Sequence, residues 1–498
     1  MSEHTTAADS APERIRGEAQ SGFFEILGNW LGNQPWFPTG RGRRSLTRTG
    51  GLRLPTPAGD ADTRLFLELH IFEVSGTEDA NGVPARISVP VVLRSRPSAL
   101  AGKSAFIGKV TTAEGEDLWV YDGARDRAFL AAVLEMARRG QGSRNGRSRG
   151  EALAGFGDWE AFSIELQRQS VPPMTENVTR TLIQPAGAGE EDWAKKVIID
   201  FPRRPQAERT TVTDTAVTLT RAYSTAIPRV LGVVTGAWED RSDPSWESVE
   251  WESGDLAIIR EAGAEAPNAL DLARAALQSG KRFKNSARFL GLTLGNFHAD
   301  LAGSFGAYPQ NTEQVKDMSR YAQQALTTQW EKVRTEFDED EAADLNEVID
   351  LMVMQLREAD EPLPLQSIHG QMNAAAFHKL EQERWVIAEP PALFEHSLGL
   401  NDVVAALMSL ANLVMEIASE TPEITDAETD SKDPVNFGQW YEEISSAFIE
   451  GYRTSDADTK GLDSVFFRAA MLTQALELFS RWEGQWVFRP SLLLQADS

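Results

Sequence analysis

Hydrophobic residues recur at helical spacing along most of the chain from Asn268 onward. A period of about 3.6 residues places the apolar side chains on one face and therefore predicts amphipathic helices. We predict these helices over residues 268–278, 285–304, 311–336, 339–358, 398–419, 436–453 and 461–483. This part of the chain is expected to be mostly helical.

The first half of the chain has a different pattern, in which short hydrophobic runs are separated by turn residues. Runs of this kind predict β-strands. The predicted strands cover residues 65–74, 87–93, 104–110, 118–121, 179–184, 196–201, 227–234 and 256–260. An aromatic helix is expected near Phe23, and further helices over 125–138 and 209–224. The pattern predicts an α+β chain with antiparallel strands.

Composition narrows the class of protein. A chain of 498 residues is long enough for about two to four domains or lobes. The net charge of −25 disfavours binding to nucleic acid or to anionic membranes, and no apolar run reaches the roughly 20 residues that span a bilayer. Residues 1–20 lack the apolar stretch of a secretory signal and are expected to be a disordered tail.

The cysteine and histidine content excludes several kinds of site. There is no cysteine, which excludes disulfides and thiolate metal sites and fits a cytoplasmic protein. The six histidines show no metal-binding spacing, so no metal site is expected from them. Residues 138–150 form a basic loop that nearly spells a Gly-x-Gly-x-x-Gly phosphate cradle, but no hydrophobic strand precedes it. We interpret this loop as a solvated surface segment or an arm that contacts a partner.

One segment carries most of the information about function. Residues 368–391 contain His369-Gly370-Gln371, then Ala376, then the apolar strand Trp385–Ile387 followed by Ala388-Glu389-Pro390-Pro391. The segment resembles the catalytic core of aminoglycoside-phosphotransferase-like kinases. In that family, a His-Gly-Asp sequence is followed by a polar metal ligand and by a strand that ends in a metal-binding Asp.

Further motifs extend the resemblance to the actinobacterial maltokinases and the related glucosamine kinases along nearly the full chain. Trp36-Phe37-x-x-Gly40-Arg41-Gly42-Arg43 resembles their N-terminal cap, and Val197–Arg204 resembles their lysine-bearing strand. Leu294-Gly295-x-x-His298 and Asn401-Asp402-Val403-Val404 resemble segments of their C-lobe. The resemblance implies a bilobal protein-kinase-like fold with an α+β cap. It divides the chain into the tail 1–20, a cap 21–121, an intermediate N-lobe 122–262 and a helical C-lobe 263–498.

Four positions depart from the family pattern. The family's lysine corresponds to Asp200, its catalytic Asp to Gln371, its polar metal ligand to Ala376, and only Glu389 keeps an acid near the metal position. An amide such as Gln371 does not accept a proton near neutral pH. An anion at position 200 would repel nucleotide phosphates, unless Lys195 or Lys196 replaces the missing cation. His369 is interpreted as a buried histidine that braces a turn rather than as a catalytic group.

These departures lead to two hypotheses from different classes. The first is a pseudokinase that is not an enzyme, with no cofactor, no metal and no catalytic residue. The resemblance implies that such a protein is a regulatory subunit of a trehalose synthase-like glycoside hydrolase, and Trp36 and Arg41 are the candidate contacts with the partner or within the cap. The alternative is an ATP- and Mg-dependent sugar kinase with a rearranged site, acting on maltose or an amino sugar. A sugar sensor without catalysis is a third, weaker hypothesis.

Overall fold

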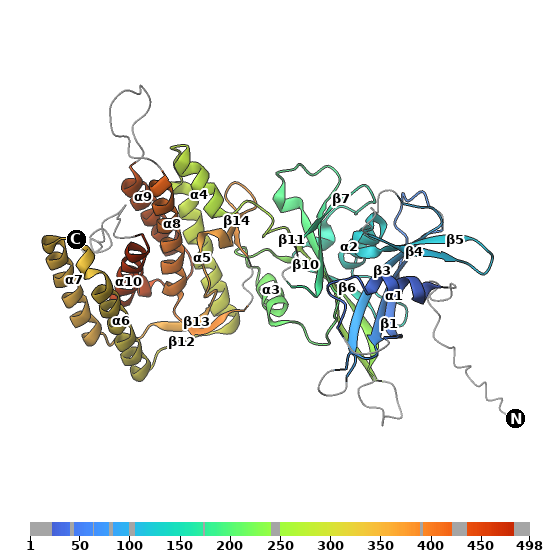
Figure 1. Cartoon of the computed structure of the whole chain (residues 1–498), viewed down its shortest axis with the longest axis horizontal. Coiled ribbons are helices and arrows are strands. Elements are labelled where there is room, and N and C mark those ends of the chain that lie inside the picture. The colour runs from blue at the N-terminus through green and yellow to red at the C-terminus, as the bar shows by residue number, and fades with distance from the viewer. Residues whose placement is uncertain are drawn as a thin grey trace, which may run out of the picture. The chain divides into compact units, whose positions relative to one another are not determined.

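The structure is a computed structural model that describes residues 22–39, 44–62, 64–78, 83–98, 105–172, 175–240, 250–388, 392–420 and 436–482. The chain forms two compact units, shown with their elements in Figure 1. The first comprises Met1–Thr210 and Val230–Glu261, and the second comprises Thr211–Arg229 and Ala262–Ser498. Each unit is described by itself below.

One antiparallel sheet runs through the first unit. Its strands follow the order β4-β5-β3-β2-β1-β10-β11-β9-β8-β7, and β6 pairs with β10. The strands are β1 (Leu46–Leu54), β2 (Phe66–Val74), β3 (Ala85–Arg94), β4 (Phe106–Thr111), β5 (Asp117–Asp122), β6 (Arg149–Ala152), β7 (Gln167–Val171), β8 (Val178–Gln184), β9 (Val197–Pro202), β10 (Val230–Asp240) and β11 (Glu250–Glu261). The strands expected for the cap and those expected for the N-lobe therefore share a single sheet.

Strand β1 joins the two halves of this sheet, and the sequence pattern does not predict it. Its centre holds Gly50 and Gly51, which weaken a strand signal because glycine has no side chain to pack. The structure explains both residues. A Cβ on Gly50 would lie 2.4 Å from the backbone oxygen of Ala237 on β10, and Gly51 has φ +146°, a value that side chains rarely adopt.

Two helices cover opposite faces of the sheet in the cap region. Helix α1 (Phe23–Leu31) packs Phe23, Leu27 and Leu31 against one face, where Phe72 and Val89 are buried. Helix α2 (Arg127–Arg138) packs its own apolar residues against the other face. Strands β2 and β3 are therefore buried on both sides, which accounts for their nearly continuous hydrophobic sequence.

The second unit is mostly helical, as the hydrophobic spacing predicts. Its helices are α3 (Thr211–Arg221), α4 (Ala269–Gln278), α5 (Lys284–Phe305), α6 (Thr312–Val333), α7 (Glu339–Glu358), α8 (Gly399–Glu420), α9 (Phe437–Arg453) and α10 (Val465–Arg481). Short strands form two small sheets: β12 (Ala307–Pro309), β13 (Pro364–Ile368) and β16 (Phe394–Ser397) in one, and β14 (Phe377–Lys379) and β15 (Trp385–Ile387) in the other. The predicted α+β class, with a mostly helical C-terminal part, is confirmed.

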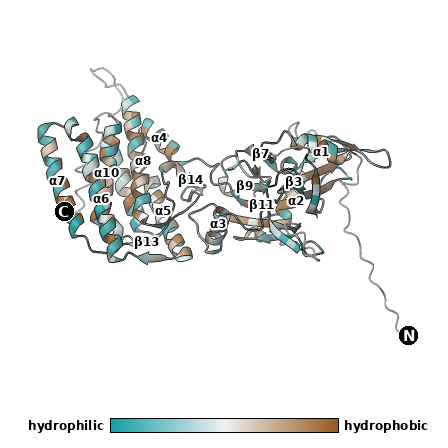
Figure 2. Ribbon diagram, turned by 60° about the horizontal axis from the view of Figure 1, so that its bottom comes forward, coloured by the Kyte–Doolittle hydropathy of each residue, from teal (hydrophilic) through white to brown (hydrophobic). Residues whose placement is uncertain are grey.

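Helix α8 is the hydrophobic centre of the second unit. It is strongly hydrophobic in Figure 2, whereas α7 carries many hydrophilic residues. Among the described residues α8 alone is long and apolar enough to cross a membrane, but 67% of its apolar window is buried inside the unit. This burial is typical of the core helix of a soluble domain.

Helices α5 and α9 touch backbone to backbone. A Cβ on Gly291 of α5 would lie 1.9 Å from the carbonyl oxygen of Phe448 on α9. A Cβ on Gly451 of α9 would lie 1.9 Å from the carbonyl oxygen of Arg288 on α5. The two glycines therefore set how closely these helices approach.

We expect Gly291→Ala to lower the free energy of unfolding of the second unit by roughly 1–3 kcal/mol, because the added methyl group forces the helices apart. Gly303→Ala is the matched control, because Gly303 lies on the same helix and its Cβ would meet nothing within 4 Å. This control should raise stability by up to about 1 kcal/mol through helix propensity. Urea unfolding followed by circular dichroism measures both, and equal effects of the two substitutions would contradict the helix contact.

Candidate active site

The loop that carries His369, Gly370 and Gln371 is held by one buried carboxylate. Oδ2 of Asp402, in the first turn of α8, accepts a hydrogen bond from the backbone nitrogen of His369 at 2.8 Å. Its Oδ1 accepts one from the nitrogen of Gly370, also at 2.8 Å. Asp402 is 1% exposed, so these hydrogen bonds form away from water and fix the loop strongly.

Two further side chains hold Asp402 itself. Oδ2 of Asp402 lies 3.0 Å from Nε2 of His298 on α5, and Nδ1 of His298 lies 2.9 Å from the hydroxyl of Tyr452 on α9. Burial raises the pKa of Tyr452, and the nearby carboxylates of Asp402 and Asp458 raise it further. Tyr452 is therefore a neutral hydroxyl, and three helices meet at the base of the loop.

His369 is a structural brace in this arrangement. Its side chain is buried, and burial lowers the pKa of its imidazole, although Asp402 and a hydrogen bond to Ala388 favour the protonated form. Its Nδ1 accepts a hydrogen bond from the backbone nitrogen of Gln371 at 3.3 Å. A neutral imidazole with this role agrees with the interpretation drawn from the sequence.

The remainder of the loop also keeps a defined shape. The backbone nitrogen of Ala374 donates to Oγ of Ser409 on α8 at 2.7 Å, and Oδ1 of Asn373 accepts from the nitrogen of Ala375 at 2.9 Å. The backbone oxygen of Ala376 accepts from the nitrogen of Ala388, the residue after β15, at 2.8 Å. Gln371 is exposed, whereas Ala376 is partly buried and adds no polar side chain.

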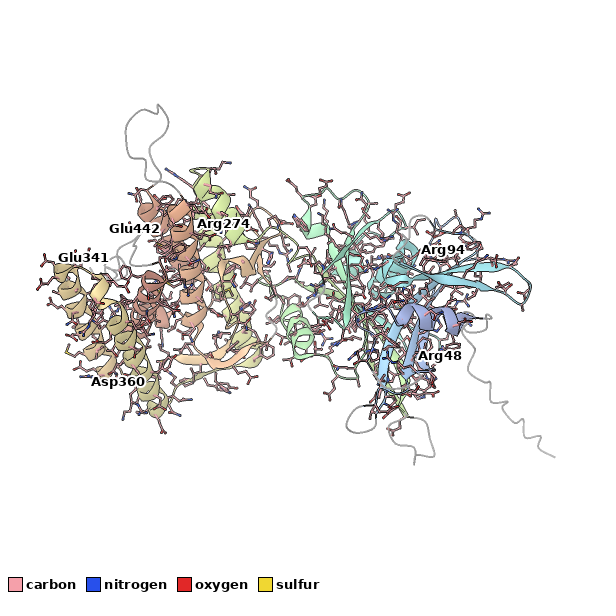
Figure 3. The ribbon with its side chains drawn as sticks, viewed as in Figure 1. Arg48, Arg94, Arg274, Glu341, Asp360 and Glu442 are labelled. Atoms are coloured by element: carbon pink, nitrogen blue, oxygen red, sulfur yellow. The ribbon has the colours of Figure 1, made fainter. Side chains whose placement is uncertain are left out.

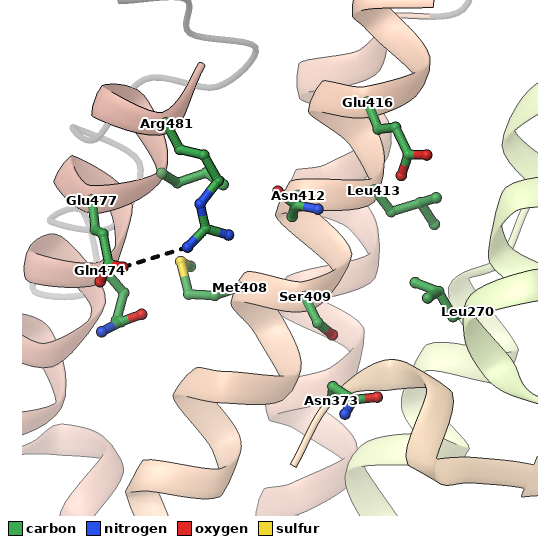
Figure 4. A pocket seen from close by; sticks show the side chains of 11 residues that line it. Leu270, Asn373, Met408, Ser409, Asn412, Leu413, Glu416, Gln474, Glu477 and Arg481 are labelled. Atoms are coloured by element: carbon green, nitrogen blue, oxygen red, sulfur yellow. Dashed lines mark hydrogen bonds and ion pairs between the residues drawn. The ribbon is translucent and has the colours of Figure 1, made fainter. Parts of the chain in front are cut away.

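A pocket of about 280 Å³, lined by both polar and apolar side chains, adjoins the loop at Asn373 (Figure 4). Helix α8 contributes Ser409, Asn412 and Glu416, and α10 contributes Gln474, Glu477 and Arg481. Both sets have the spacing i, i+3, i+7, which places each set on one face of its helix. The sequence reasoning missed these residues, although a polar stripe on the most buried helix of the unit is a signal that could have revealed them.

The charges that line this pocket are paired. Glu477 forms an ion pair with Arg481 at 3.4 Å, and Glu416 forms one at 2.8 Å with Arg274 of α4, which Figure 3 labels. The pairing raises the pKa of the Arg274 guanidinium, mainly through its hydrogen bond to Glu416. The other polar groups are amides and a hydroxyl, so the pocket suits an uncharged ligand with many hydroxyl groups, or one with a single amine facing a glutamate.

Asp200 lies on β9 in the first unit and is part of a compact charge network. Nε and Nη2 of Arg180 on β8 donate to its two oxygens at 2.7 and 3.0 Å, and Arg260 on β11 donates to the same carboxylate. Two guanidinium groups therefore contact a carboxylate that the sequence presents as an isolated anion, and its repulsion of nucleotide phosphates stays a prediction. Lys196 is buried against Trp193, and Lys195 pairs with Asp192.

The other predicted positions have different outcomes. Trp36 is only 5% exposed, and the Arg203 guanidinium lies over its ring at 4.7 Å, so Trp36 packs inside the first unit rather than forming an exposed partner contact. Glu389 and Arg41 lie outside the described residues, as does the tail 1–20. Among the described residues, no group of three or more histidine or acidic side chains is arranged to hold a metal ion.

Comparisons with known proteins identify the cap region of the chain. Residues 30–126 match the maltokinase N-terminal cap domain. No curated protein matches the chain. This match confirms the predicted resemblance to the maltokinases over the cap, and the observed elements confirm the α+β class.

Several solved structures are similar to the chain. A glucosamine kinase in complex with glucosamine, ADP and inorganic phosphate is 16% identical, with a TM-score of 0.49 over 92% of this chain and 96% of that one. A choline kinase from Cryptosporidium parvum is 8% identical, with a TM-score of 0.32 over 73% and 89% of the two chains. A spectinomycin phosphotransferase in complex with ADP and spectinomycin is 10% identical, with a TM-score of 0.26 over 62% and 93%.

These findings overturn two predictions. The expectation that the protein is not an enzyme and the expectation that it uses no cofactor are both wrong, because the cap domain that the chain matches is that of a kinase, maltokinase. The sequence reasoning failed by treating each altered position alone. At position 200, the neighbouring Arg180 and Arg260 offset the negative charge that Asp200 introduces.

We expect Asp402→Asn to lower the free energy of unfolding by about 3 kcal/mol, because the amide cannot accept from both backbone donors and cannot pair with His298. Asp344→Asn is the control, since Asp344 is exposed on α7, and it should change stability by less than about 0.5 kcal/mol. Urea unfolding of both variants is the measurement. A loss in Asp402→Asn no greater than in the control would show that this carboxylate does not hold the loop.

Proposed function

We propose that this protein is an ATP-dependent sugar kinase with a rearranged active site, acting on maltose or an amino sugar such as glucosamine. The observation that carries the proposal is a catalytic-type loop, fixed by Asp402, that adjoins a polar pocket of sugar-binding character. We propose that the kinase acts in the cytoplasm, where ATP is available.

The chemistry of phosphoryl transfer is compatible with the altered residues. The reaction depends mainly on positioning and on neutralising phosphate charge, with little covalent work for the protein. Gln371 can orient an acceptor hydroxyl by hydrogen bonding, although it cannot take its proton. The loss of the carboxylate at this position is therefore expected to reduce the rate without abolishing the reaction.

A kinase site needs at least one acid that binds the metal ion and at least one cation that binds the phosphates. Mg²⁺ in kinases is held by one or two carboxylates together with the nucleotide phosphates and water. Glu389 lies two residues after the end of strand β15 in the sequence and is the acid we assign to this role. In the first unit, Arg180 and Arg260 contact the carboxylate of Asp200 and are the cations that we propose for the role of the family's lysine.

We expect the purified protein with Mg-ATP to transfer phosphate to maltose or glucosamine. The transfer is measured as ADP release and as a new sugar phosphate signal in ³¹P NMR. Glu389→Ala should reduce turnover at least about 100-fold through loss of the metal ligand, whereas Glu395→Ala, at an exposed acid of β16, should not. Asn412→Ala and Gln474→Ala should raise the KM for the sugar about tenfold with little change in kcat, as loss of a substrate hydrogen bond predicts.

Two results would contradict this proposal. One is the absence of turnover above background with maltose, glucosamine and trehalose. The other is turnover that neither Glu389→Ala nor the pocket substitutions change, because the activity would then belong to a contaminating kinase or to a different site.

We also propose that the kinase associates with a trehalose synthase-like glycoside hydrolase through its basic hairpin, residues 141–150. Arg144, Arg147 and Arg149 are exposed there and form no ion pair with any described residue, although the chain as a whole carries a charge of −25. Arg147 lies 3.5 Å from the ring centre of Trp251, which is 38% exposed. Exposed arginine beside tryptophan is typical of residues that dominate protein interfaces.

We expect the two proteins to co-elute in size-exclusion chromatography and to separate as salt is raised, because exposed charges are screened within about 10 Å at 0.1 M salt. Arg144→Glu with Arg147→Glu should weaken association at least tenfold. Arg282→Glu makes the same type of charge change at another exposed arginine and should not. Separate elution at micromolar concentration would refute the association. If the control Arg282→Glu weakened association as much as the double variant, the hairpin would not be the contact surface.

A further inference from the structure

Three arginine side chains gather at the start of α2, on the face of the sheet that this helix covers. Arg125 and Arg127 flank Asp126, the N-cap residue of α2, and Arg168 lies on the edge strand β7. Nη1 of Arg125 donates a hydrogen bond to Oγ of Ser170 on β7, which is two residues from Arg168 and therefore on the same face of the strand. We call Arg125, Arg127 and Arg168 the arginine cluster.

The register of β7 explains why Arg168 lies on the same face of the sheet as α2. Arg168 pairs with Ile183 of β8, and Ser170 pairs with Thr181. Ile183 is buried in the same core as the apolar residues of α2, and Oγ1 of Thr181 donates to the backbone oxygen of Ala124 at 2.9 Å. Residues directly opposite each other in paired strands share one face. The cluster is therefore built by the fold from two segments that are about 40 positions apart in the sequence.

The three cations of the cluster repel one another. Burial lowers the pKa of the Arg168 guanidinium, and the positive charges of Arg127 and Arg125 lower it further. Guanidinium groups nevertheless stay protonated in proteins. Three like charges are therefore held close together against their repulsion, and a bound anion would relieve this repulsion.

The carboxylate next to the cluster is already engaged elsewhere. Among the described residues, Asp126 is the acid whose charge partly offsets the repulsion at Arg168. Its Oδ1 and Oδ2 accept hydrogen bonds from Arg94, which Figure 3 labels, at 2.8 and 3.0 Å, and Oδ1 also accepts from the backbone nitrogens of Ala128 and Phe129. Asp126 thus holds Arg94 and caps α2, and the cluster keeps an excess of positive charge.

We propose that the arginine cluster binds a phosphate group, either inorganic phosphate or the phosphate of a sugar monoester. The planar fork of a guanidinium group donates paired hydrogen bonds that match phosphate oxygens. Arg127 has such capacity to spare, because its buried Nε has no hydrogen-bond partner among the described residues. The partial positive charge at the N-terminus of α2 adds to the attraction, although Asp126 already uses the first amide donors.

The position of the cluster agrees with this ligand. All three arginines are half-buried, so a small anion can reach them and is partly shielded from water when bound. Charge-assisted hydrogen bonds are stronger in such surroundings than at a fully exposed surface. The cluster belongs to the first unit, and its binding of phosphate does not require the protein to be an active kinase.

The test is isothermal titration of the full chain, without nucleotide or Mg²⁺, with sodium phosphate and with glucose 6-phosphate. Sodium chloride keeps the ionic strength constant, so that screening does not change. We expect saturable binding, and Arg127→Gln combined with Arg168→Gln should weaken it at least about tenfold through loss of charge-assisted hydrogen bonds. Arg53→Gln is the control, since Arg53 is exposed on β1, five strands from β7 in the sheet, and it should change nothing.

Two further variants keep the test decisive. Arg127→Gln alone should weaken binding about threefold, and it replaces the double variant if thermal unfolding shows that the double variant is not folded. Arg260→Gln removes a cation proposed for the nucleotide phosphates and should leave phosphate binding at the cluster intact. Tighter binding of glucose 6-phosphate would assign the cluster to a phosphate monoester, and tighter binding of inorganic phosphate would assign it to the free anion.

Three results would overturn the proposal. The first is that neither probe binds saturably at constant ionic strength. The second is that Arg53→Gln weakens binding as much as the cluster substitutions do. The third is that Arg260→Gln abolishes binding while the cluster substitutions leave it unchanged, because the phosphate would then bind at the proposed nucleotide site. Failure of the phosphate-transfer assay alone would leave the titration result unaffected.

Discussion

The second unit is organised around the carboxylate of Asp402. This one side chain accepts hydrogen bonds from two consecutive backbone nitrogens and pairs with a histidine on another helix, which in turn binds a tyrosine on a third. A buried charge is costly unless it is fully hydrogen-bonded. Three partners satisfy this requirement, two from the loop and His298 from α5, and Tyr452 of α9 holds His298 in turn. The shape of the loop and the packing of the helices therefore depend on one another.

The close contact of α5 and α9 serves the same arrangement. Gly291 and Gly451 allow these helices to touch, and His298 and Tyr452 follow on the same two helices, seven residues and one residue later. Gly370 has a φ of +75°, and a Cβ there would lie 2.0 Å from the ring of Phe394. Glycine is therefore required both where the helices meet and where the loop turns.

The sequence predicts helices far better than it predicts the site. Helices α4 to α10 follow from apolar spacing because each buries one continuous face, and their observed bounds lie close to the predicted ones. The sequence did not predict strand β1 because its two central glycines weaken the strand pattern. They are needed for the close approach of neighbouring strands, which is visible only in the folded sheet. The polar stripes of α8 and α10 were missed because each alone resembles an ordinary solvated face. Only their apposition makes a pocket.

Asp200 shows most clearly why the charge of a site cannot be inferred from one residue of the sequence. Its two arginine partners lie 20 positions before it and 60 after it, and they meet it only because β8, β9 and β11 are neighbours in the sheet. Pairing with two guanidinium groups offsets the charge of an acid that the sequence alone presents as an isolated anion. The chemistry of a site is set by the summed charges and donors at a place in space. A lost lysine or aspartate in the sequence therefore does not by itself define what a site binds, because the neighbouring side chains contribute to its charge.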